Sequence, residues 1–268
     1  MSAPMDWLGL GGKTCVITGA GGGIGRALAI NFAKAGAHVG LLDLSEADAQ
    51  ATAREVADCA RARTAVVACD VSNPDSVAHA AAAIESALGR CDILVNNAAL
   101  LRPGALDTLS FAEWNALLSV NLTGYFLCSQ AFGAQIRGKD AGAIVHVASI
   151  SGSNPQGASG AYSVSKAGIL MLSRQIAVEW GPSGLRSNVV SPGLVETPMS
   201  RAFYDAPGVR EKRSAVVPMR RIAQPQDIAD AALFLASARA SYINGEEVLV
   251  DGGYAGMLMN MIPRPGYD

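Results

Sequence analysis

The stretch that decides the fold runs from residue 14 to residue 25 and reads Thr14-Cys15-Val16-Ile17-Thr18-Gly19-Ala20-Gly21-Gly22-Gly23-Ile24-Gly25. Its first five residues are apolar or β-branched, as in a buried strand, and a helical apolar pattern covers residues 24–35. Glycines at such a junction let a pyrophosphate reach backbone N–H groups at a helix N-terminus, where the helix dipole favours negative charge. A tight turn without a ligand is the alternative, but the position between the first strand and the first helix favours a cofactor site. Its expected members are Gly19, Gly22, Gly23, Ile24 and Gly25.

Outward from this junction, short apolar runs alternate with longer Ala-rich helical patterns. Strands are expected at 14–18, 39–42, 65–69, 92–95, 143–148, 187–190 and 247–250. Helices are expected at 24–35, 45–60, 74–88, 111–136, 161–180 and 225–236. Strands that are apolar on both sides indicate a parallel sheet covered on both faces. The fold prediction is therefore an α/β, Rossmann-like, doubly wound parallel sheet of about seven strands with helices on both faces.

The composition shifts nowhere along the chain, so one dinucleotide-binding catalytic domain is expected over residues 1–268. Residues 197–221 break the strand–helix rhythm with three prolines and mixed charges, and we interpret them as a lid insertion. Residues 254–268 form an apolar C-terminal tail, expected to pack against the lid or a neighbouring subunit's site. A simple contact with the core of its own subunit is the alternative.

Bulk properties exclude several classes of protein. Half of the 268 residues are hydrophobic, 16% are charged and the net charge is −2, which argues against nucleic-acid binding. No uncharged apolar stretch reaches the length of a membrane helix, so no membrane partner is expected. Five cysteines without a Cys-x-x-Cys pair indicate neither a disulfide framework nor a zinc site. With no recognisable signal peptide, a reducing cytoplasm is expected. No bound metal is expected either.

Asp43 ends the second expected strand, about twenty residues after the glycine loop. A carboxylate there can accept hydrogen bonds from the adenosine ribose and would repel the 2′-phosphate of NADP. No Arg or Lys occurs at residues 20–24 or 43–46 to neutralise that phosphate, so NAD is the expected cofactor. A role for Asp43 as a helix cap is the alternative, but Ser45 can fill it.

Other polar groups end neighbouring strands. Asp70 and Val71 follow the third expected strand, where the adenine could be held, and Asn97 and Ala98 follow the fourth. Ligands of open α/β sheets bind at the carboxyl edge, where these residues are expected. Turn formation is the alternative for each, because Asp and Asn also favour turns.

Tyr162 and Lys166 lie four residues apart at the start of a helix, so both point to one side of it. A free phenol has a pKa near ~10, and a nearby cation lowers it towards the range useful for proton transfer. Ser149, just past the fifth expected strand, can hydrogen-bond a substrate oxygen. Asn121, inside a long apolar helical pattern, could hold a relay water, with a structural kink as the alternative.

Together these pieces resemble the short-chain dehydrogenase/reductase family, of the single-domain type, over about residues 10–253. The resemblance also rests on the segment that contains Pro192, Gly193 and Thr197, whereas Ala99 replaces the family's usual glycine. It implies that Tyr162 is the general acid/base, that Lys166 lowers its pKa and binds the nicotinamide ribose, that Ser149 polarises the substrate oxygen, and that Asn121 anchors the relay water. It also implies that Asn97 lies near the adenosine half of NAD, that Val195 and Thr197 orient the carboxamide, and that the protein is a homotetramer.

The activity implied is NAD-dependent interconversion of a secondary alcohol, a polyol or sugar-like hydroxyl being favoured, and its ketone. Reduction of 3-oxoacyl thioesters, or of cyclic or steroid ketones, is the alternative. The thioester reaction usually uses NADP, so Asp43 disfavours it. A nicotinamide-sensing role without catalysis also remains open on fold alone, although the complete tetrad disfavours it.

Overall fold

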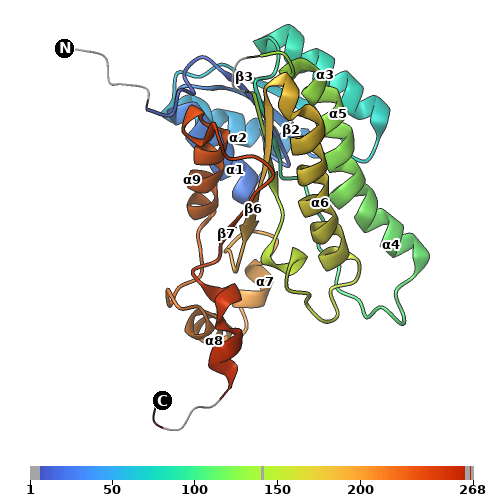
Figure 1. Ribbon diagram of the computed structural model, residues 1–268, viewed down its shortest axis with the longest axis vertical. Coiled ribbons are helices and arrows are strands. Elements are labelled where there is room, and N and C mark those ends of the chain that lie inside the picture. Colours follow the sequence, from blue (N-terminus) through green and yellow to red (C-terminus); the bar gives the residue numbers. More distant parts are fainter. Residues whose placement is uncertain (1–6, 140–141, 263–265, 267–268) are drawn as a thin grey trace, which may run out of the picture.

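One parallel sheet organises the computed structural model, which describes residues 7–139, 142–262 and 266 (Figure 1). The strands of this described part are β1 (Thr14–Thr18), β2 (His38–Asp43), β3 (Thr64–Ala68), β4 (Ile93–Asn96), β5 (Gly142–Val147), β6 (Leu185–Pro192) and β7 (Glu247–Val250). Their order is β3-β2-β1-β4-β5-β6-β7, and every neighbouring pair is parallel. The predicted doubly wound sheet of about seven strands is confirmed.

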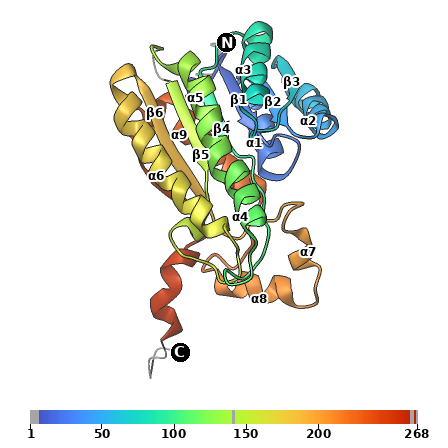
Figure 2. The same ribbon diagram turned by 90° about the vertical axis from the view of Figure 1, so that its right-hand side faces the viewer.

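Helices cover both faces of the sheet (Figures 1 and 2). The first face carries α1 (Gly23–Lys34), α2 (Glu46–Cys59) and α9 (Pro225–Ala236), whose buried side chains include Phe32, Val56 and Ile228. The second face carries α3 (Pro74–Leu88), α4 (Phe111–Leu118), α5 (Gly124–Ile136) and α6 (Tyr162–Trp180). Its apolar core includes Ile84 and Phe132. Two apolar layers therefore enclose the sheet.

The carboxyl ends of all seven strands meet at one edge because the strands are parallel. The strand order reverses between β1 and β4, and such a reversal opens a crevice for ligands at that edge. The short helices α7 (Arg201–Tyr204) and α8 (Val209–Val216) lie at the same end of the molecule (Figure 2). Both belong to the segment predicted to be a lid, and that assignment stays a prediction.

The C-terminal segment projects from the same end (Figures 1 and 2). Residues Tyr254–Met261 form a 3-10 helix, in which Leu258 and Met259 are exposed. Of the predicted tail, residues 263–265 and 267–268 lie outside the described residues. Its packing against a lid or a neighbouring subunit stays a prediction.

The long helix expected over residues 111–136 is interrupted. A π-helical turn, Ser119–Thr123, separates α4 from α5. Asn121 lies in this turn, and its side chain pairs with the backbone of Leu100 in place of facing solvent. The apolar pattern continues through the turn, which is why the sequence predicts an unbroken helix. In the part of the chain that the structure describes, no helix is long and apolar enough to cross a membrane.

Candidate active site

The glycine loop between β1 and α1 is closely packed against its own backbone. Gly19 and Gly23 have φ values of 64° and 52°, which glycine adopts without strain. A Cβ at Gly25 would lie 1.9 Å from the backbone oxygen of Gly19, so no larger residue fits there. A Cβ at Gly22, the N-cap of α1, would meet no atom within 4 Å. The loop is therefore held tightly from inside and open at Gly22, as a phosphate cradle requires.

Two polar side chains tie this loop to the end of β4. The Oγ1 atom of Thr18 accepts hydrogen bonds from the backbone N–H groups of Asn97 (2.9 Å) and Ala98 (3.0 Å). The amide of Asn97 donates to the backbone oxygens of Thr18 and Gly19, at 3.0 and 3.1 Å. Asn97 and Ala98 thus lie at the predicted edge, where they fix the shape of the loop.

Asp43 ends β2 and faces the same loop. Its carboxylate accepts a hydrogen bond from the backbone N–H of Gly21 at 2.8 Å and another from Ser45 at 2.9 Å. Ser45 caps α2, as expected, by accepting from the N–H of Asp48. Asp70 is exposed beyond β3, and its carboxylate accepts hydrogen bonds from the N–H and the hydroxyl of Ser72. Such hydrogen bonds are typical of a turn. Val71 is buried against Gly124.

The segment after β6 returns to the glycine loop. Pro192 ends β6, and Gly193 packs so closely on Asp251 that a Cβ would lie 2.7 Å from the Cβ of that residue. Val195 pairs with Ala223 in an isolated β-bridge. Thr197 lies close to the loop: a Cβ added at Gly23 would be 3.3 Å from the Cβ of Thr197. The expected cofactor residues of this segment are therefore brought to one edge with the loop.

Three of the four predicted catalytic residues converge beside β5. Ser149 follows that strand, and Tyr162 is the first residue of α6. The Nζ atom of Lys166 lies 5.6 Å from the centre of the Tyr162 ring and donates to the backbone oxygen of Val147 at 3.0 Å. Lys166 is buried, whereas Tyr162 is partly exposed. A phenol, a hydroxyl and an amine thus share one corner at the carboxyl edge.

Burial dominates the ionisation of this group. It raises the pKa of Tyr162 above its ordinary value, and a hydrogen bond with Ser149 lowers it again in part. Burial also lowers the pKa of Lys166 to about 7. The pKa of Tyr162 therefore lies above its ordinary value, which is opposite in direction to the lowering expected from a charged Lys166. The predicted role of Lys166 stays a prediction.

Asn121 completes the predicted set from the π-helical turn. Its amide group accepts from the N–H of Leu100 at 2.7 Å and donates to the oxygen of Leu100 at 2.9 Å. It also lies 3.3 Å from the hydroxyl of Ser165, on the helix of Tyr162. The side chain is thus satisfied by protein groups, and the structural role weighed as the alternative is present. Its role as anchor of a relay water stays a prediction.

Two residues at the site, Tyr125 and Arg26, were not predicted from the sequence. Tyr125, buried in α5, donates from its hydroxyl to the oxygen of Val147 at 2.9 Å, the acceptor that also holds Lys166. Its ring lies 5.4 Å from the Lys166 amine. Arg26 contacts the oxygen of Gly21 at 2.7 Å. Tyr125 follows Asn121 by four residues, and that spacing was the available signal.

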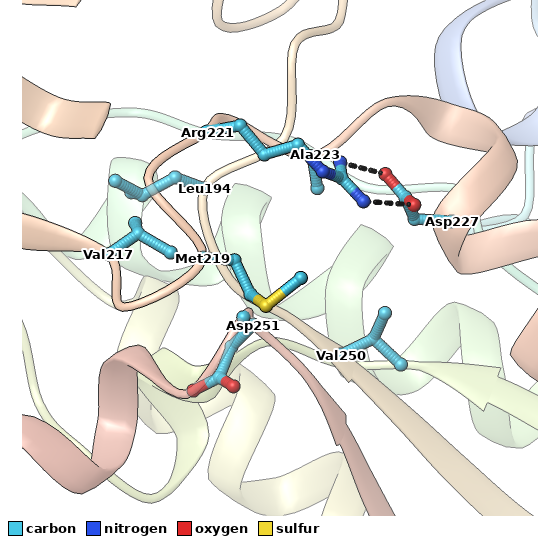
Figure 3. Close-up of a pocket in the computed structure, with 9 residues that line it drawn as sticks. Leu194, Val217, Met219, Arg221, Ala223, Asp227, Val250 and Asp251 are labelled. Carbon is cyan, nitrogen blue, oxygen red and sulfur yellow. Dashed lines mark hydrogen bonds and ion pairs between the residues drawn. The ribbon is translucent and has the colours of Figure 1, made fainter. Parts of the chain in front are cut away.

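A cavity of about 170 Å³ lies behind the segment that follows β6 (Figure 3). It is lined by Leu194, Val217, Met219, Arg221, Ala223, Asp227, Val250, Asp251 and Gly252. At one side of the cavity, the guanidinium of Arg221 donates two hydrogen bonds of 2.7 Å to the carboxylate of Asp227, away from Asp251 (Figure 3). None of the four predicted catalytic residues lines it.

A parallel α/β sheet with a glycine loop and a Ser–Tyr–Lys corner defines a class of nicotinamide-linked oxidoreductases, and comparisons with known proteins agree. A family model described as "Enoyl-(Acyl carrier protein) reductase" matches residues 19–255. The chain is 39% identical to D-threitol dehydrogenase of Mycolicibacterium smegmatis, over 91% of this chain and 94% of the relative. It is also 39% identical to galactitol 2-dehydrogenase (L-tagatose-forming) of Cereibacter sphaeroides, over 91% and 96%.

A solved structure gives the same result. The crystal structure of a putative gluconate dehydrogenase from Agrobacterium tumefaciens matches with a TM-score of 0.90 and 31% identity, over 94% of this chain and 99% of that one. The chain belongs to the short-chain dehydrogenase/reductase family. The predicted family, the fold and the class of alcohol-linked oxidoreductase are confirmed.

Proposed function

We propose that this chain is an NAD-dependent dehydrogenase that interconverts a secondary alcohol of a polyol or sugar-like substrate with the ketone. The observation that carries the proposal is the corner formed by Ser149, Tyr162 and Lys166 at the carboxyl edge, where β4 lies between β5 and the strand that leads into the glycine loop. Two relatives named for the oxidation of threitol and galactitol support a polyol. The description of the matching family model keeps acyl thioesters as the second candidate to assay.

The residues present fit a nicotinamide dinucleotide. The open backbone at Gly22 leaves room for a pyrophosphate, and Asp43 offers a carboxylate for the adenosine ribose. Asp70, Val71 and Asn97 would border the adenosine half, and Val195 and Thr197 the carboxamide. When bound, the nicotinamide supplies the hydride acceptor in oxidation and the donor in reduction.

The protein's own groups manage the proton. Ser149 donates a hydrogen bond to the substrate oxygen, and Tyr162 as phenolate removes the hydroxyl proton during oxidation. Lys166 in its charged form favours that phenolate. Asn121 anchors a water that passes the proton on to solvent. In reduction Tyr162 returns the proton to the same oxygen.

We propose a homotetramer in a reducing cytoplasm. Phe126 on α5 and Met171 and Val178 on α6 are exposed apolar side chains, and these two helices lie side by side in both views (Figures 1 and 2). Leu249 is exposed on β7, an edge strand. Such surfaces favour association with further copies. All five cysteines are free, which supports a reducing compartment.

Replacing Tyr162 by Phe tests the chemistry. The variant is expected to lose turnover while it binds NADH nearly as well as the wild type, because only the hydroxyl is removed. Tyr242→Phe is the matched control, since Tyr242 is fully exposed. Substantial turnover by Tyr162→Phe with retained cofactor binding contradicts the proposed function.

A further inference from the structure

Arg26 is a cation fastened to the glycine loop. It follows Gly25 on the first turn of α1, and its guanidinium makes three contacts. It donates to the oxygen of Gly21 at 2.7 Å, to the hydroxyl of Thr52 at 3.2 Å and to the carboxylate of Glu55 at 2.9 Å. Thr52 and Glu55 both belong to α2, so the contacts join the loop, α1 and α2.

The cation lies close to the group that is proposed to select the cofactor. Gly21 accepts from Arg26 through its backbone oxygen and donates to Asp43 through its N–H at 2.8 Å. One residue of the loop therefore separates the guanidinium from the carboxylate proposed to hold the adenosine ribose. Residues 20–24 and 43–46 contain no basic residue, but the first turn of α1 brings Arg26 back onto the loop.

An uncompensated arginine at this place would favour NADP, since guanidinium groups bind phosphates well. Here its charge is compensated. Arg26 and Glu55 form an ion pair, and their side chains are 34% and 46% exposed. Asp48 adds a second acidic residue, because a Cβ at Gly21 would lie 2.7 Å from the Cβ of Asp48. Three acidic residues, Asp43, Asp48 and Glu55, therefore surround the glycine loop beside Arg26.

We propose that Glu55 is a specificity-determining residue that favours NAD over NADP by neutralising Arg26. The proposal rests on the proposed NAD-dependent function. Glu55 occupies one nitrogen of the guanidinium and cancels its charge. Without Glu55, the contacts with Gly21 and Thr52 still hold Arg26 at the loop. The uncancelled charge of Arg26 then becomes available to a 2′-phosphate.

The test measures Kd for NADH and NADPH by nicotinamide fluorescence at low salt. The Glu55→Gln variant is expected to lower the ratio of Kd(NADPH) to Kd(NADH) roughly fivefold, the size that one exposed ion pair carries. High salt should reduce this gain through screening. Adding Arg26→Gln to that variant should return the ratio to the wild-type value, since the cation is gone.

Asp58→Asn is the matched control, because Asp58 is an exposed acid on the same helix. A ratio for Glu55→Gln equal to that of Asp58→Asn overturns the proposal. A gain that survives Arg26→Gln also overturns it. The proposed function fails differently: it fails if the wild type prefers NADPH or binds neither nucleotide, whatever Glu55→Gln does.

Discussion

Replacing Lys166 by Met should make the protein inactive and more stable. Lys166 is 2% exposed, and burial lowers its pKa from 10.5 to about 7. The difference is about 3.5 pH units, and each unit corresponds to ~1.36 kcal/mol, so charging this amine in the folded protein costs about 5 kcal/mol. Met loses the hydrogen bond to Val147, worth ~1 kcal/mol, and some packing. The expected net gain in the free energy of unfolding is about 3 kcal/mol at neutral pH.

The gain depends on pH with a definite sign. The folded pKa lies below the unfolded one, so between about pH 7 and 10.5 the unfolded chain binds a proton that the folded chain does not. The stability of the wild type therefore rises through this window by up to ~1.4 kcal/mol per pH unit, and the full cost is present below pH 7. The Met variant lacks this titration, so its advantage shrinks as pH rises.

Urea unfolding of both proteins, followed by tryptophan fluorescence at several pH values from neutrality upward, measures this difference. Titration of all other groups cancels between the two proteins. Lys34→Met is the matched control, because Lys34 is exposed at the end of α1, and its pH dependence should match the wild type. A stability difference between Lys166→Met and wild type that is independent of pH refutes the reasoning.

Three further substitutions probe the Lys166 environment and the glycine loop. Tyr125→Phe removes one of the two donors to the oxygen of Val147 and should lower the free energy of unfolding by about 1 kcal/mol in urea. It should also raise the pKa of Lys166, because that oxygen then serves the amine alone; an unchanged alkaline limb of the pH–rate profile contradicts this. Gly25→Ala forces its Cβ against the oxygen of Gly19 and should weaken NADH binding roughly tenfold or more. Gly22→Ala, with open space around its Cβ, should weaken NADH binding and leave the Tm unchanged, and a lower Tm would show that the loop is packed there too.

The sheet was predictable because each strand carries its own signal. Parallel strands that are buried on both faces read as continuous apolar runs, and the residues at their carboxyl ends must meet at one edge. Asp43, Asn97 and Ser149 were placed at that edge by this argument, and the structure brings them there. Tyr162 was placed by its spacing from Lys166 at the start of a helix, which is α6.

Contacts between distant segments were not predictable in this way. The π-helical turn at Asn121 depends on the backbone of Leu100, twenty-one residues earlier, which no local pattern reveals. The ion pair of Arg26 with Glu55 depends on how α1 packs on α2. The shared acceptor of Tyr125 and Lys166 depends on the placement of α5 beside β5. These side chains were missed because packing decides their roles.

The most direct test of the proposed function is reduction of NAD⁺, followed by nicotinamide absorbance, with a panel of polyols, cyclic alcohols, hydroxysteroids and 3-hydroxyacyl thioesters. The wild type should form NADH with at least one polyol and more slowly form NADPH from NADP⁺ with the same substrate, and Tyr162→Phe should form neither. Faster reaction with NADP⁺, or equal rates in wild type and Tyr162→Phe, would contradict the assignment.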